Sequence, residues 1–241
     1  MMKHLVFQLY GPMASWGEIA VGERRASSAQ PSKSAILGLV GAALGVRREE
    51  EERHLELSNS YGFALRIDTR GELLRDYHTT QAPTAKGGRT YYTRKDEVAA
   101  AQLNTILSQR DYRMDARYTI ALWTKKDHAP FSLEQLGNAL SRPRFHLYLG
   151  HKSCPLALPT YAQVVETETL REAFAAVQFP EELLGELPPN SSEEYAWEEH
   201  PAPGIEARML YSRRDAVFSR RRWQFAERDE FYAALPREEE A

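Results

Sequence analysis

Apolar residues along the chain occur in short runs whose spacing predicts alternating strands and helices. Residues 4–10 are almost entirely apolar and precede a Gly-Pro pair, which indicates a first strand that ends at a turn. Ser32 can cap a helix in which apolar residues recur every three or four positions, and Gly45 stands where such a helix should end. Because Gly38 and Gly41 lie on or beside its apolar face, we expect this helix to pack closely on a sheet.

The pattern beyond this helix predicts further strands and a second helix. Residues 61–68 and 73–79 have the composition of strands, and the turn between them has hairpin length, so the two are expected to pair antiparallel. The later elements are a strand at 118–123, a helix at 132–140, a strand at 144–149 and a final Arg-rich hairpin over 205–225 around Asp215.

The order of these elements over residues 1–150 is β-α-β-β-α-β, which matches a ferredoxin-like split unit. A long polar insertion at 80–117 separates its middle elements, and insertions of this length usually mark function or disorder. We therefore expect an α+β fold with one domain at 1–160, which includes the insertion, and an extension of additional strands at 161–241 that carries an acidic segment.

Composition indicates a folded protein of the cytoplasm. With 241 residues and 42% hydrophobic side chains, the chain can bury a full core. The longest apolar stretch, residues 35–46, is too short to span a bilayer, and we see no pattern of a secretory signal. A single cysteine, Cys154, gives no disulfide framework. A cytoplasmic location without membrane contact is therefore predicted.

Charge is unevenly distributed, although the net charge of -3 argues against a simple polyanion-binding protein. Residues 181–200 contain seven acidic residues and neither Lys nor Arg, which fits either a docking segment or solvated surface. Residues 208–222 contain six Arg against one Asp, and residues 66–127 contain twelve basic against eight acidic residues. Binding partners must therefore be inferred from local segments of the chain.

The common motifs of cofactor and metal sites are missing from the sequence. It has no nucleotide-binding glycine fingerprint, phosphate loop, His-Glu-x-x-His pair or Cys-x-x-Cys pair, so no cofactor or metal ion is expected. A metal-independent ribonuclease could still use a histidine together with Lys or Tyr for acid-base chemistry. His78, His146 and His151 are the candidates for that role.

The insertion carries the composition of a single-stranded RNA contact. Basic groups can neutralise phosphates while aromatic rings stack on splayed bases, although a solvent-exposed hairpin with ordinary tyrosines has the same composition. The candidate RNA-binding residues here are Lys86, Arg89, Tyr91, Tyr92, Arg94 and Lys95.

Two further segments have donor groups suited to a phosphate. At the predicted helix start, Ser32, Lys33 and Ser34 combine hydroxyls, an ammonium and unpaired backbone N–H groups, although a plain helix cap explains the same residues. At residues 148–155 a glycine followed by donors would let the backbone approach a ligand, and a tight exposed turn is the alternative.

Four segments together resemble one known family. They are Gly11 to Gly17, Pro31 to Ser34 leading into Gly38 to Gly45, Leu74 to Thr79, and Tyr148 to Pro155, in this order. In these motifs the chain resembles the CasD family, the Cas five group of the Cascade type (subtype I-E) of CRISPR system in the RAMP superfamily. The likeness covers about residues 3–160 and fades beyond Tyr161.

This resemblance implies a ferredoxin-like domain with a protruding thumb within the insertion. It implies a non-catalytic subunit that caps the five-prime, repeat-derived handle of the guide RNA (crRNA) in antiviral defence, contacts the backbone and large subunits, and meets target DNA only indirectly. The handle-contact candidates are then Ser32, Lys33, Ser34, Arg75, Tyr77, His78, Gly150, His151, Lys152 and Ser153. Trp16 either stacks on a base or packs beneath its loop, and packing is favoured.

Two other functions remain open on the sequence alone. Some relatives cut the repeat RNA themselves, so a metal-independent endoribonuclease is the chief alternative. A protein–protein adaptor whose acidic segment docks a basic partner is the other.

Overall fold

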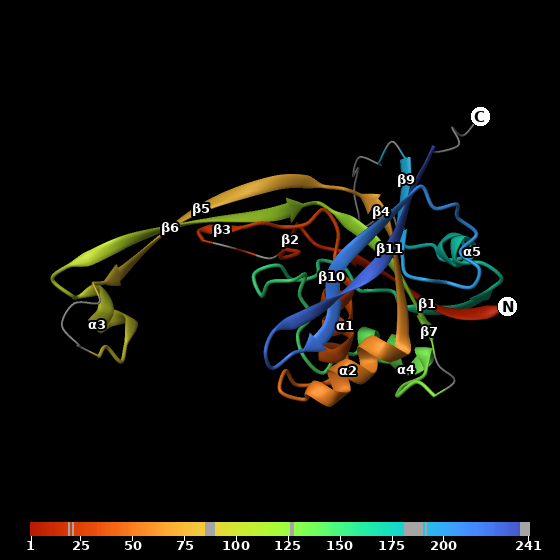
Figure 1. Ribbon diagram of the computed structural model, residues 1–241, viewed down its shortest axis with the longest axis horizontal. Helices are drawn as coiled ribbons and strands as arrows, with labels where there is room; N and C mark the ends of the chain where they lie inside the picture. Colours follow the sequence, from red (N-terminus) through yellow and green to blue (C-terminus); the bar gives the residue numbers. More distant parts are fainter. Residues whose placement is uncertain are drawn as a thin grey trace.

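A seven-stranded antiparallel sheet forms the body of the molecule in the computed structural model, which describes residues 1–18, 20, 22–84, 90–125, 128–180, 190 and 192–236 (Figure 1). Its strands lie in the order β10-β11-β9-β4-β7-β1-β8. Their bounds are β1 Met2–Tyr10, β4 Tyr61–Thr69, β7 Arg117–Thr124, β8 Gln163–Thr167, β9 Ser192–Trp197, β10 Met209–Ser219 and β11 Gln224–Pro236.

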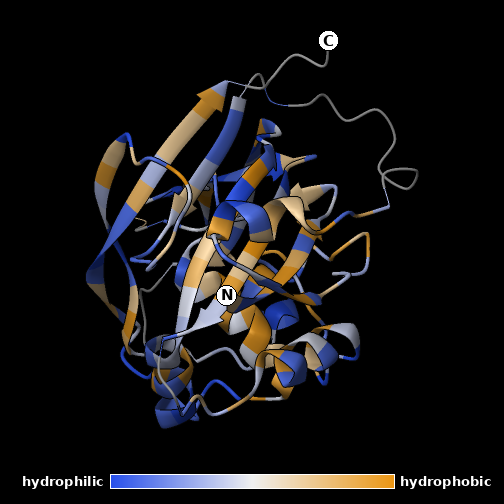
Figure 2. Ribbon diagram, turned by 90° about the vertical axis from the view of Figure 1, so that its right-hand side faces the viewer, coloured by the Kyte–Doolittle hydropathy of each residue, from blue (hydrophilic) through white to orange (hydrophobic). Residues whose placement is uncertain are grey.

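Helices cover both faces of this sheet because its central strands are apolar on both sides (orange in Figure 2). Leu5, Phe7 and Leu9 of β1 join the cluster beneath α1 (Lys33–Leu44), α2 (Glu51–Ser60) and α4 (Leu133–Ser141). Val6 faces the other way, toward a second cluster that contains Phe174 of α5 (Leu170–Ala175). The alternation along β1 therefore supplies both cores.

The helix predicted from residue 32 is confirmed as α1. The Ser32 hydroxyl accepts a hydrogen bond from the backbone N–H of Ala35 at 3.2 Å, which satisfies one of the free donors at the helix start. Gly45 follows the helix with φ of +79°, the left-handed conformation that ends many helices and that glycine adopts without strain. The strand predictions at 4–10, 61–68 and 118–123 and the helix at 132–140 are also confirmed, with bounds that differ by at most two residues.

The expected pairing of 61–68 with 73–79 is wrong. The second of these strands, β5 (Glu72–Pro83), pairs with β6 (Leu103–Met114) in a separate four-stranded sheet with β2 (Met13–Ala14) and β3 (Arg24–Arg25). Gly71 has φ of +63° and lies against the backbone of Met114, so the chain turns out of the first sheet here. This β5–β6 ribbon extends far from the body and carries α3 (Arg94–Val98) at its tip (Figure 1).

Two other expectations need correction. Residues 144–149 form no strand apart from a single bridge between Tyr148 and Pro155. The N–H groups of Arg144 and Phe145 bind the last carbonyls of α1 instead, at 3.0 and 3.2 Å. The hairpin at the end of the chain exists, but its turn lies at residues 220–223, and Asp215 is buried within β10.

Strands from beyond residue 160 are part of the same sheet as those before it. β8 pairs with β1 at one edge, and β9 pairs with β4, which brings β11 and β10 to the other edge. Within the described residues, no helix is long and apolar enough to cross a membrane.

Candidate nucleic-acid interface

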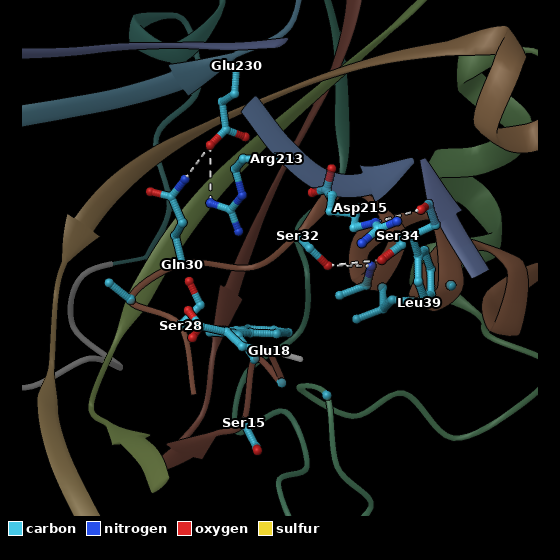
Figure 3. A pocket seen from close by; sticks show the side chains of 18 of the residues that line it. Ser15, Glu18, Ser28, Gln30, Ser32, Ser34, Leu39, Arg213, Asp215 and Glu230 are labelled. Carbon is cyan, nitrogen blue, oxygen red and sulfur yellow. Dashed lines mark hydrogen bonds and ion pairs between the residues drawn. The ribbon is translucent and has the colours of Figure 1, made fainter. Parts of the chain in front are cut away.

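A groove of about 1440 Å³ runs between the start of α1 and the β10–β11 hairpin. Its walls come mainly from four segments far apart in sequence: residues 15–18 with Ala20, residues 28–42, the turn at 146–150 and the C-terminal hairpin, and Ile67, Arg70 and Glu194 complete the lining. Figure 3 shows these walls, with Ser32 and Ser34 on the α1 side and Arg213, Asp215 and Glu230 on the hairpin side. The groove therefore joins the N-terminal motifs to the Arg-rich end of the chain.

A buried carboxylate ties the hairpin to α1. An Asp215 carboxylate oxygen accepts the backbone N–H of Lys33 at 2.8 Å, so a residue from β10 caps the first turn of α1. The same carboxylate is held by Arg228 through two hydrogen bonds of 2.6 and 2.9 Å. Because Arg228 also binds Glu230 at 2.6 Å, the hairpin wall is a connected network of paired charges.

The pKa directions in this network follow from burial and pairing. Desolvation lowers the pKa of Lys33, and the attraction of Glu198 opposes it only in part. Desolvation also lowers the pKa of Arg228, but hydrogen bonds and charges from Asp215, Glu230 and Glu198 outweigh it and raise the value. Arg228 therefore stays charged and fixes the wall.

Lys33 is not available as an RNA contact, which corrects the sequence prediction. Its side chain is 4% exposed, and its ammonium lies 2.7 Å from a carboxylate oxygen of Glu198. A buried ammonium needs such a partner, so the lysine serves the interior of the protein. Ser32 and Ser34, by contrast, line the groove, with their hydroxyl oxygens 3.1 Å apart.

Trp16 packs within the protein, as favoured from the sequence. It is 3% exposed, and its ring meets Tyr118 edge to face with centroids 5.9 Å apart. Its backbone N–H donates to the Ser27 hydroxyl at 3.0 Å, which fixes the loop that follows β2. Trp16 still forms part of the groove wall, but a base cannot stack on a ring so enclosed.

Gly150 lets two walls of the groove meet. Its φ is +81°, and a Cβ atom at this position would overlap the carbonyl oxygen of Ser15. The Ser15 N–H donates to the carbonyl of Leu149 at 2.9 Å. The close approach that the glycine permits is therefore made by the chain's own backbone. His151, Lys152 and Ser153 follow in an exposed turn outside the groove, where the His151 ring bonds the Ser153 hydroxyl at 2.7 Å.

Arg75, Tyr77 and His78 lie on β5 in the protruding ribbon, apart from the groove. The Arg75 guanidinium binds Asp111 of β6 at 2.8 Å, and this hydrogen bond is the main cause that lowers the Asp111 pKa. Tyr77 is 57% exposed. His78 lies 2.5 Å from the Asp76 carboxylate on the ribbon surface.

The tip of the ribbon holds the remaining predicted residues. Tyr92 is 89% exposed, and Arg94 and Lys95 belong to α3, where Arg94 pairs with Glu97 at 2.8 Å. Tyr91 is half-buried beside them. Lys86 and Arg89 lie outside the described residues. The predicted residues thus divide between the groove, the exposed turn and the ribbon.

The hairpin wall of the groove was not among the predicted RNA-binding residues. Arg213, Arg214, Arg220 and Trp223 all line the groove, and Trp223 is 53% exposed. The excess of Arg over Asp in residues 208–222 was the available signal. Among the described residues there is no group of three or more His, Cys, Asp or Glu side chains that could hold a metal ion.

Comparison with known proteins places this fold among CRISPR proteins. Residues 4–230 match the family model described as CRISPR-associated protein Cas5, well beyond the 160 residues over which the motifs gave a resemblance. The CRISPR system Cascade subunit CasD of Escherichia coli K12 is 36% identical over 165 residues, which cover 67% of this chain and 70% of that protein.

Solved structures agree in fold. A chain of a CRISPR RNA-guided surveillance complex superposes with a TM-score of 0.65 at 23% identity, covering 97% of this chain and 91% of its own length. A crystal structure of a Cas protein superposes with a TM-score of 0.58 at 25% identity, covering 97% and 95%.

Proposed function

Because the chain belongs to the Cas5 family of CRISPR-associated proteins, we propose that it is a non-catalytic subunit of a Cascade-type complex that holds the repeat-derived five-prime handle of the guide RNA. The relative from Escherichia coli is described as a Cascade subunit, which supports the assignment to that complex. The partners are then the guide RNA, the backbone subunit and the large subunit, with target DNA met indirectly.

The observation that carries this proposal is the groove between α1 and the hairpin. Two serine hydroxyls line one wall, and arginines of β10 and the following turn line the other. Hydroxyls and guanidinium groups are the donors that bind the phosphates of single-stranded RNA. A single strand with splayed bases fits a groove of this size better than a duplex does, so we assign the handle to it.

The β5–β6 ribbon supports contacts outside the groove. It extends away from the body, and its exposed residues include Tyr77, Tyr92 and Lys95 (Figure 1). We assign it as the thumb, which inserts beside the first segment of the guide–target duplex and contacts the adjacent backbone subunit. Arg75 is held by Asp111 and stiffens the thumb base.

The sheet order supports the ferredoxin-like assignment. β8-β1-β7-β4, with α1 after β1 and α4 after β7, is the strand order of a β-α-β-β-α-β split unit, and all its neighbouring strands are antiparallel. On this basis the unit ends with β8, and the C-terminal extension supplies β9, β10 and β11, which build the second wall of the groove.

A non-catalytic role is favoured by where the histidines lie. Of His78, His146 and His151, only His146 lines the described groove. His78 is on the thumb and His151 is in the exposed turn. A general base and a general acid must both reach the same phosphodiester, so no two of these three histidines can form such a pair in the groove.

The experiment is to assemble the protein with its neighbouring subunits on end-labelled repeat–spacer RNA in the presence of a chelator. Retention without cleavage, lost when the five-prime handle is removed, is the expected result. Site-specific cleavage in chelator would make the protein a processing ribonuclease, and His146→Ala would be the first variant to make. If RNA without the five-prime handle is retained equally well, the capping role is contradicted.

A further inference from the structure

One indole ring, that of Trp223 in the turn between β10 and β11, contacts two guanidinium groups. The Cζ atom of Arg48, which follows α1, lies 4.5 Å from the centre of the Trp223 ring. The Cζ atom of Arg220, at the start of the turn, lies 4.8 Å from the same ring. Each guanidinium group therefore makes a cation–π contact with Trp223, and the charge of Arg48 also acts on Arg220.

Arg220 has no ion pair among the described residues, in contrast to three other half-buried arginines. Arg66, Arg213 and Arg228 each bind a carboxylate within 3.1 Å. For Arg220 the described residues provide no carboxylate partner, and its buried Nε atom has no hydrogen-bond acceptor among them. Burial, followed by the charge of Arg48, lowers its pKa. An anion at this position would pair with the Arg220 charge and would also accept a hydrogen bond from its Nε atom.

The backbone around these residues is adapted to keep Arg220 in place. The Arg220 guanidinium lies over Gly38 of α1, where a Cβ atom would approach its Nη2 atom to 3.2 Å. An alanine at this position would require the Arg220 side chain to shift by a few tenths of an ångström. Trp223 has φ of +56°, a conformation that an aromatic residue rarely adopts. Strain of this kind is concentrated at functional sites.

We propose that Arg48 and Arg220, held by Trp223, bind one backbone phosphate of the guide RNA where it leaves the groove. Arg220 and Trp223 line the groove, so a strand lying along the α1 wall reaches them without leaving the protein surface. The assignment of the phosphate to guide RNA rests on the proposed function. Guanidinium groups bind phosphate through paired N–H donors, which a single lysine cannot reproduce.

The chain contains a matched control for the test. Arg221 is in the same turn and carries the same charge, but it is exposed and does not line the groove. The assembled complex would therefore be compared as wild type, Arg48→Gln, Arg220→Gln and Arg221→Gln. Dissociation constants for guide RNA would be measured over a series of salt concentrations, because each neutralised phosphate on a single strand contributes about 0.7 to the slope of log K against log salt.

In Arg220→Gln, log K is expected to fall less steeply with log salt, with the magnitude of the slope smaller by about 0.7. In Arg221→Gln the slope should stay close to the wild-type value. A neutral methylphosphonate linkage, moved along the handle one position at a time, should weaken wild-type binding at one position and have no effect there in Arg220→Gln. Equal slopes for Arg220→Gln and Arg221→Gln, or the same methylphosphonate profile in both, would overturn the proposal.

The melting temperature and the assembly of the complex distinguish an RNA contact from a structural role of Arg220. Without RNA, Arg220→Gln should melt at the wild-type temperature or above, because an unpaired half-buried charge is removed, whereas a purely structural arginine would lower it. If Arg220→Gln prevents subunit assembly while RNA binding is intact, the residue serves a protein interface and the proposal fails. If the wild-type complex retains no handle RNA, the proposed function itself fails, independently of these arginines.

Discussion

Replacing Gly150 by alanine should weaken the protein through two separable effects. The left-handed backbone at φ of +81° is unfavourable for any residue with a Cβ atom, by about 1–2 kcal/mol. The new methyl group would also overlap the Ser15 carbonyl oxygen, which is backbone and cannot rotate away. Overpacking of this kind costs about 1–3 kcal/mol. The free energy of unfolding should therefore fall by roughly 2–5 kcal/mol in total.

Gly22→Ala is the matched control for this prediction. Gly22 has φ of +71°, but no heavy atom lies within 4 Å of the position its Cβ would take. It therefore reports the backbone term alone, about 1–2 kcal/mol. Urea unfolding of both variants measures the two losses, provided that the dependence on denaturant is unchanged. If the two variants lose equal stability, the contact between Gly150 and Ser15 is not rigid, and the groove wall is not fixed as described.

Other predictions concern the interior and the thumb. Lys33→Ala should lower the free energy of unfolding by about 1.5–3 kcal/mol, because it removes the closest partner of buried Glu198 while Lys125 and Arg228 still pair with that carboxylate. A thermal melt unchanged from wild type would argue against this pairing. Burial lowers the pKa of His200 to about 4, so the unfolded chain binds a proton at this residue at a higher pH than the folded protein does. The free energy of unfolding should therefore decline as pH falls from about 6.5 to 4. In His200→Gln, urea unfolding over this range should show a smaller decline. Replacing Arg94 and Lys95 by alanine should reduce complex assembly or target binding and leave the melting temperature unchanged, since both lie at the thumb tip.

The elements that could be predicted from sequence are those fixed by neighbouring residues. α1 is specified by its own cap at Ser32 and its glycine stop at Gly45, so its bounds follow from a short window. The pairing of β5 could not be predicted in this way, because its partner β6 begins some twenty residues later and the local turn at Gly71 imitates a hairpin. Residues 144–149 alternate like a strand, yet the N–H groups of Arg144 and Phe145 bind carbonyls at the end of α1.

The candidate site was only partly predictable for a related reason. Ser32 and Ser34 line the groove as their motif suggested, but the burial of Lys33 depends on Glu198, a residue 165 positions away. Such long-range pairs leave no trace in the spacing of the sequence. The Arg excess near the C-terminus was visible, whereas the difference between Arg220 inside the groove and Arg221 outside it depends on the turn geometry.

The use of Asp215 as the cap of α1 has a consequence for synthesis in the cell. Translation proceeds from the N-terminus, so α1 leaves the ribosome long before β10 and β11. Until β10 arrives, the first turn of α1 lacks its carboxylate cap, and Lys33 lacks its partner Glu198 until the end of β9 has been made. The groove is therefore completed last, and a ligand that needs both of its walls cannot bind before the hairpin has folded.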